Sequence, residues 1–164
     1  MESQKKELIE YMRTFDIVLF SMFIVFGLVG IATLFFVGIP GIMFIIPAVL
    51  SFSYWFNSYR GAASCVDSFE KAASLNTLLS DFKSGERFLN GRVIRGNHFL
   101  ISKGSGMVYR RQDIVRIYEH RKKNGFAGDS LVLMAETSDG KKHELTFLSM
   151  KGKDKEDTAK LTQG

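Results

Sequence analysis

The residue types most able to bind a metal or move a proton in this chain are its three histidines. His98, His120 and His143 fall on three different predicted strands, and neither a cysteine nor a paired acid stands near any of them at the spacing of a metal site. We therefore expect no metal site and no histidine-centred chemistry.

Three further features also fall short of a catalytic pattern. The turn 103–106 is glycine-rich, but it lacks the following Lys-Ser/Thr pair and helix of a phosphate loop, so a hairpin turn explains it better. The acidic cluster Asp154, Glu156 and Asp157 alternates with lysines and is interpreted as a solvated helix face. Cys65 is expected to be a packed helical residue. We expect no catalytic residue and no cofactor, and hence a protein that is not an enzyme.

The distribution of charge is more informative. The net charge of the chain is +5, and residues 60–164 carry 19 basic and 13 acidic side chains. Because side chains alternate along a strand, one face of the predicted strand 114–123 carries both basic and aromatic groups. The candidate surface for anionic lipid or a protein partner comprises Arg110, Arg111, Arg116, Tyr118, His120 and Lys122. A merely solvated basic face is the alternative, and nucleic acid ranks far lower because a membrane tether would hold the domain at the bilayer.

The elements that must position this surface begin with a long apolar segment, residues 17–59, which contains no charged side chain. As one helix it would extend about 65 Å, roughly twice the hydrocarbon core of a bilayer. The stretch Gly38-Ile39-Pro40-Gly41 supplies a turn, so we predict a two-helix transmembrane hairpin with spans at 17–37 and 42–56. A soluble core hairpin, or a signal peptide followed by a buried strand, is the alternative.

The second span carries its own markers. Its apolar stretch is short for a perpendicular crossing, and Tyr54, Trp55 and Tyr59 follow it as predicted anchors at the membrane interface. Pro47 lies within this span and is expected to kink it.

Basic residues predict the orientation. Lys5, Lys6 and Arg13 precede the first span, the turn carries no charge, and many basic residues follow the second span. The positive-inside rule therefore places both termini in the cytoplasm. Residues 1–16 form a predicted amphipathic helix that either lies on the inner leaflet or packs against the cytoplasmic domain.

The remaining chain is predicted to form a helical stalk and then a sheet. Residues 60–85 read as helix, with a short second helix at 75–83, and from residue 86 the pattern alternates as strands do. We expect a domain over 86–164 that folds by itself as an antiparallel sheet with one dry face and a C-terminal helix from residue 151. The predicted strands are 91–95, 98–103, 107–110, 114–123, 130–137 and 143–149, and the predicted core is Val93, Phe99, Ile101, Val108, Val115, Ile117, Leu131, Leu133, Leu145 and Phe147.

A family resemblance covers most of the chain. The stretches GRVIRGNHFLISKGSGMVYRRQDIVRIYEHRKKN and LVLMAETSDGKKHELTF follow two apolar helices, and Lys103 to Tyr118 is the most specific part. Together they resemble a family of small, uncharacterised membrane proteins of Gram-positive bacteria, with an N-terminal two-helix hairpin and a PH-like cytoplasmic domain. The resemblance implies an α+β cytoplasmic domain and no established activity.

These observations lead to two hypotheses of function. The first is a membrane-anchored scaffold or regulatory module that presents its PH-like domain to a membrane protein partner, a second copy of the chain or anionic lipid headgroups. The second is an accessory subunit of a membrane transporter or membrane enzyme, bound through its hairpin, where Gly27, Gly30, Ala32 and Thr33 permit close helix contact.

Overall fold

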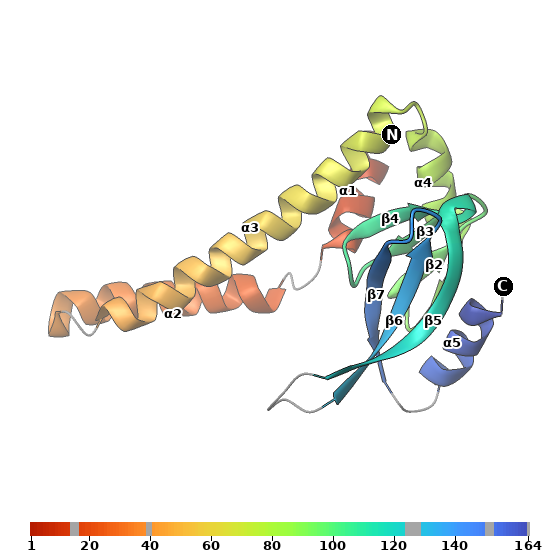
Figure 1. Ribbon diagram of the computed structural model, residues 1–164. Helices are drawn as coiled ribbons and strands as arrows, with labels where there is room; N and C mark the ends of the chain where they lie inside the picture. The colour runs from red at the N-terminus through yellow and green to blue at the C-terminus, as the bar shows by residue number, and fades with distance from the viewer. Residues whose placement is uncertain (14–16, 39–40, 124–128, 150–152, 164) are drawn as a thin grey trace. The chain divides into compact units, whose positions relative to one another are not determined.

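The computed structural model describes residues 1–13, 17–38, 41–123, 129–149 and 153–163 and divides the chain into two compact units (Figure 1). The folded unit comprises Met1–Met12 and Ala62–Gly164, and the apolar unit comprises Arg13–Gly61. The folded unit is thus larger than the predicted domain 86–164, since it also takes in both segments that flank the apolar unit.

The described elements give an α+β fold, which confirms the α+β part of the predicted class. Helices precede two antiparallel sheets, and a helix closes the chain. The elements are α1 (Glu2–Met12), α2 (Ile17–Val37), α3 (Ile42–Lys71), α4 (Leu75–Ser84), β1 (Glu86–Phe88), β2 (Val93–Arg95), β3 (Phe99–Ser102), β4 (Met107–Arg110), the 3₁₀ turn η2 (Arg111–Asp113), β5 (Ile114–Lys123), β6 (Asp129–Thr137), β7 (Lys142–Leu148) and α5 (Lys153–Thr162).

The strands form a continuous meander in two sheets. Sheet A has the order β1-β2-β3-β4 and sheet B the order β5-β6-β7, with every neighbouring pair antiparallel. The predicted turns at 96–97, 104–106 and 138–141 connect these strands as expected. Gly106 and Gly140 adopt the positive φ values, 64° and 79°, for which glycine is suited.

Sheet A is buried on both faces, which differs from the single dry face that the sequence predicts. Strand β3 is buried at all four of its positions. Because side chains alternate, the residues of this sheet divide between two separate cores. One core takes Ile94, Phe99, Ile101 and Val108, and the other takes Phe88, Leu89, Val93, Leu100 and Tyr109.

Helices from both sides of the apolar unit cover the first face of sheet A. Leu8 and Met12 of α1 lie in the same core as Ala62 and Val66 at the end of α3, together with buried residues of α4. Of the two options for the N-terminal helix, the structure therefore shows packing on the domain. The predicted stalk, residues 60–85, is part of this core as well, because the apolar side chains on its buried face must be shielded from water.

Sheet B and α5 cover the second face. Leu161 of α5 joins Leu133 and Leu145 of sheet B in this core. The interpretation of the acidic cluster as a solvated face was wrong for two of its three members. Asp154 and Asp157 are only 4% and 6% exposed, although Glu156 is exposed.

Each buried carboxylate has a partner. Asp157 accepts a hydrogen bond from the Leu89 amide at 2.7 Å, and Asp154 pairs with the guanidinium of Arg92. The two acids therefore fasten α5 to the turn between β1 and β2.

Two register shifts alter the predicted core. A bulge between Ile114 and Arg116 displaces β5, so Val115 is 66% exposed while Ile117 is partly buried. A second shift affects the β6–β7 pairing, and Phe147 is 53% exposed. Predicting Val115 and Phe147 as core residues was therefore wrong, because a bulge reverses the alternation beyond it. Leu131 is half-buried. The remaining predicted core residues are buried: Val93, Phe99, Ile101, Val108, Leu133 and Leu145.

Within the apolar unit, α2 and α3 contact each other at two levels. Gly30 of α2 has no room for a side chain, since a Cβ there would lie 2.8 Å from Ile45 of α3. Farther along, the rings of Phe23 and Phe52 pack in a tilted arrangement with centroids 5.1 Å apart, and those of Phe20 and Trp55 do so at 5.5 Å. Gly30 is thus part of the contact between α2 and α3 of this chain, and its expected contact with a partner's helix stays a prediction.

One described helix, α3, has the length and apolar composition of a membrane-crossing helix, and residues 20–36 form a shorter apolar helix. Helix α3 continues through Pro47 to Lys71, beyond the predicted end of the span. Gly38 has the positive φ of 79° that the predicted turn requires, whereas Ile39 and Pro40 lie outside the described residues.

Burial of both faces of sheet A makes a stability prediction. Leu100 and Ile101 lie in different cores, on the two faces of sheet A. Leu100→Ala and Ile101→Ala each leave a cavity in one core and should each lower the free energy of unfolding by about 2 to 5 kcal/mol. Val115→Ala is the matched control and should change it by less than about 0.5 kcal/mol. Amide hydrogen exchange across sheet A, measured on the full chain in detergent micelles, provides the free energies. If only one of the two buried truncations is costly, sheet A has a single dry face.

Candidate functional site

The basic side chains predicted on β5 are largely paired with acids of sheet B. Arg116 donates to Glu136 at 2.7 Å and stacks over the ring of Tyr118 at 4.9 Å. Lys122 contacts Glu144 at 2.8 Å. These ion pairs reduce the positive charge that the strand can offer to a ligand.

The other residues of the predicted basic and aromatic surface lie at two positions, on β5 and at the end of β4. His120 is exposed on the same face of β5 as Arg116 and Tyr118. Arg110 ends β4, and Arg111 begins η2 beside it, both of them exposed. Of the predicted surface residues, Arg111 and Arg116 line a common hollow, which shares Arg95 and Arg111 with the groove described next.

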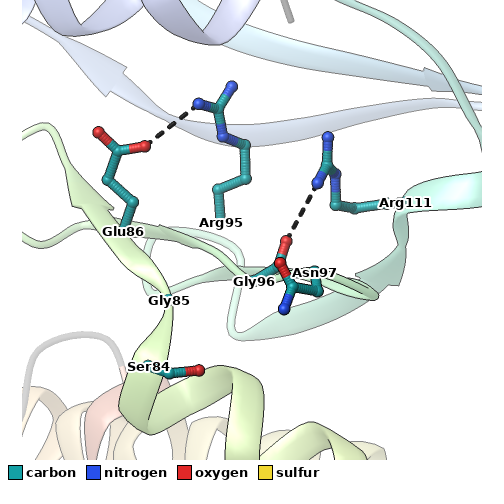
Figure 2. Close-up of a pocket in the computed structure, with 7 residues that line it drawn as sticks. All are labelled: Ser84, Gly85, Glu86, Arg95, Gly96, Asn97 and Arg111. Carbon is teal, nitrogen blue, oxygen red and sulfur yellow. Dashed lines mark hydrogen bonds and ion pairs between the residues drawn. The ribbon is translucent and has the colours of Figure 1, made fainter.

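A polar groove lies where α4 meets the edge of sheet A. Its volume is about 530 Å³, and Figure 2 shows Glu86, Arg95 and Arg111 projecting to the same side of the backbone at Gly85 and Gly96. We call it the arginine groove, and its lining comprises Ser84, Gly85, Glu86, Arg95, Gly96, Asn97 and Arg111.

The floor of the arginine groove is built around the buried Asp81 of α4. One carboxylate oxygen of Asp81 accepts hydrogen bonds from the backbone amides of His98 and Phe99, at 2.7 and 2.9 Å. Its carbonyl accepts from the amide of Gly85 at 2.8 Å. The end of α4 is thereby held against the turn between β2 and β3.

Glycine is required at this close approach. A Cβ at Gly96 would lie 2.4 Å from the side chain of Asp81, and one at Gly85 would lie 2.5 Å from its carbonyl oxygen. Glycine at both positions therefore lets the end of α4 pack directly against the turn between β2 and β3.

Two guanidinium groups form the basic side of the groove. Arg95 donates to Glu86 at 3.2 Å and to the carbonyl of Lys160 at 3.3 Å, and it lies 4.9 Å from the ring centroid of Phe88. Arg111 donates to the carbonyl of Gly96 at 3.2 Å. Both side chains are therefore oriented by neighbours.

Arg95 was missed at the level of sequence, although a signal for it exists. Strands β2 and β4 both pair antiparallel with β3. They therefore run in the same direction, and both finish at the same end of sheet A. Arg95 ends β2, and Arg110 and Arg111 stand at the end of β4. Basic residues that end alternate strands of a meander are therefore candidates for a shared site.

The predicted interface anchors gather with arginines in the apolar unit. The guanidinium of Arg13 lies 5.0 Å from the ring centroid of Trp55 and 5.6 Å from that of Tyr59. Arg60 stacks over Phe56 at 5.6 Å, and Tyr54 is 57% exposed. Basic and aromatic side chains thus gather at one end of the apolar segment.

The Cys65 thiol and the histidines are the remaining groups with catalytic potential. Burial raises the pKa of the Cys65 thiol, which disfavours a reactive thiolate. Among the described residues, no three histidine, cysteine, aspartate or glutamate side chains gather as a metal site would require. His143 of sheet B packs against Tyr109 of sheet A, with ring centroids 5.1 Å apart, and the Nδ1 atom of His98 lies 3.6 Å from the carboxylate of Asp81.

Comparison with protein-family models, with curated proteins and with solved structures finds no match to this chain. The functional argument therefore rests on the residues and their geometry.

The tight glycine floor makes a second prediction. Gly96→Ala should destabilise the folded unit, because the new Cβ would overlap the Asp81 side chain and break its hydrogen bonds to β3. Gly61→Ala is the matched control, since nothing lies within 4 Å of a Cβ there. In the interior of α3 that change should stabilise by about 0.5 to 1 kcal/mol. Thermal unfolding of the full chain in micelles would measure both, and equal midpoints for the two variants would contradict the assigned floor.

Proposed function

We propose that this chain is a membrane-anchored, non-enzymatic module of the bacterial cytoplasmic membrane. In this proposal α2 and α3 cross the bilayer as a two-span hairpin, and the folded unit lies in the cytoplasm. There it presents a PH-like domain to anionic lipid headgroups or to a protein partner, as a scaffold or regulator.

The observation that carries the proposal is that both ends of the apolar unit enter one folded core. Leu8 and Met12 precede the apolar unit, Ala62 and Val66 follow it, and all four are buried in the same cluster. Lys5 of α1 also pairs with Asp67 and Glu70 of α3. A segment whose two ends belong to one compact unit returns to the side from which it started. An even number of crossings satisfies this constraint, and the length of the segment allows two.

Exposed apolar side chains support the membrane part of the proposal. Among the described residues, nearly all exposed large hydrophobic side chains lie on α2 and α3, and Phe35 and Phe36 are 84% and 89% exposed. Such a surface is unfavourable in water and favourable in lipid. The arginines and aromatic rings at one end of the segment have the chemistry of a membrane–water interface.

The PH-like part of the proposal is supported by the order of elements. Within the described part of the chain, seven strands form sheets of four and three, and a helix follows that packs on the second core. This order agrees with the resemblance found in the sequence. Fold alone implies no ligand, so the basic residues carry the argument for anionic partners.

The topology can be tested by labelling single cysteines in intact cells, on a Cys65→Ser background. A reporter cysteine at Ile39 should react with a membrane-impermeant reagent, while reporters at Ser3 and Ser149 should stay protected until the membrane is opened. Both protected positions belong to the folded unit, which the proposal places in the cytoplasm. Reaction at Ser3 or Ser149 in intact cells would overturn the proposed orientation.

The lipid contact can be tested with the full chain in nanodiscs. A fluorophore at position 120 of a Cys65→Ser, His120→Cys variant should be quenched by nitroxide-labelled headgroups in discs rich in phosphatidylglycerol, and much less in neutral discs. High salt should remove the difference, because exposed charges are screened within about 8 Å at physiological ionic strength. Changing Arg110, Arg111, Arg116 and Lys122 together to Ser should also remove it. Equal quenching by both lipids would leave a protein partner as the better proposal.

The accessory-subunit hypothesis is favoured by one feature of α2. Nothing lies within 4 Å of a Cβ at Gly27, so this glycine leaves a smooth patch that the contact with α3 does not use. Purification of the full chain from native membrane discriminates between the two hypotheses. The hairpin is the binding element if a membrane protein co-purifies with the variant in which the four basic residues are changed to Ser but no longer co-purifies with the Gly27→Leu variant.

A further inference from the structure

We propose that the arginine groove is a binding site for a phosphomonoester group, held between Arg95 and Arg111. The inference deepens the proposed function and rests on it in one respect, the placing of the groove in the cytoplasm. Phosphomonoesters occur there both as soluble metabolites and as headgroups of lipids such as phosphatidic acid.

The charges of the groove favour an anion. Arg111 is exposed, and among the described residues its guanidinium donates only to the neutral carbonyl of Gly96. Its charge has no carboxylate partner there, unlike the charges of Arg116 and Lys122 on β5. Glu86 partly offsets Arg95, but its side chain is 61% exposed and the contact is 3.2 Å long. Such an exposed pair contributes little and can be displaced by a dianion.

The geometry favours phosphate over a smaller anion. A guanidinium presents several N–H donors in a plane and recognises phosphate oxygens in pairs. Figure 2 shows the two guanidinium groups extending in the same direction above the Gly85 and Gly96 backbone, with Asn97 beside Gly96. The volume of about 530 Å³ accommodates a phosphate together with part of the group that it esterifies.

Rigidity supports a built site. Asp81 fixes the floor with two hydrogen bonds to backbone amides, and Phe88 lies beneath the guanidinium of Arg95. Binding therefore requires little ordering of the protein, which favours affinity.

The test is isothermal titration of the full chain in neutral-lipid nanodiscs with glycerol 3-phosphate. We expect saturable binding, weakened at least tenfold by Arg111→Gln and by Arg95→Gln. Arg121→Gln is the matched control, because Arg121 pairs with Asp129 on β5 outside the groove, and its affinity should equal that of the original chain. Unchanged thermal unfolding of the two groove variants would show that the fold is retained. Glycerol and acetate should give no comparable heat.

A second arm distinguishes the source of the phosphate. In nanodiscs that contain phosphatidic acid, loss of the glycerol 3-phosphate signal identifies the lipid headgroup as ligand, and a retained signal identifies a soluble phosphomonoester. Absence of saturable binding in neutral discs, or equal affinity in Arg111→Gln and the original chain, overturns the inference. Neither result bears on membrane topology, which the cysteine labelling tests independently.

Discussion

The packing of α1 against the end of α3 is the contact on which the rest of the structure depends. It joins the residues before and after the apolar unit in one core, over the first face of sheet A. Without the cover that α1, the end of α3 and α4 provide together, Ile94, Phe99 and Ile101 would face water, at a cost of about 1.5 to 3 kcal/mol for each large side chain. The proposed membrane topology rests on the same contact, because the residues on both sides of the apolar unit belong to one core.

The sheet with two dry faces also explains where a ligand could bind. Its faces are occupied by helices on one side and by sheet B with α5 on the other, so binding is left to edges and strand ends. The ends of β2 and β4 meet at one such edge, and Arg95 and Arg111 stand there over a glycine floor. The basic residues of β5, by contrast, already pair with acids in sheet B. The paired basic residues of β5 thus stabilise sheet B. The arginines of the arginine groove, by contrast, retain positive charge that can bind an anion.

The sequence predicts local features well and long-range features poorly. The apolar helices follow from composition, and the turns at Gly106 and Gly140 follow from local backbone preference. The three-residue β1 escapes detection because so short a strand has no measurable period. A bulge at Val115 cannot be read from an alternating pattern. The burial of Asp154 depends on Arg92, which is distant in sequence, and the pairing of Arg95 with Arg111 depends on strand order.

Zero-length carbodiimide cross-linking in native membrane vesicles tests the shared core most directly. Lys5 lies 2.9 Å from Asp67, and Glu70 is its second partner, so activated carboxylates of α3 should form amide bonds with α1 within one chain. Mass spectrometry should find Lys5 joined to Asp67 or Glu70, and the double change Asp67→Asn with Glu70→Gln should remove both products. If Lys5 is instead modified freely and never joined to α3, the two ends of the apolar unit do not share a core. The account of fold and topology would then be wrong.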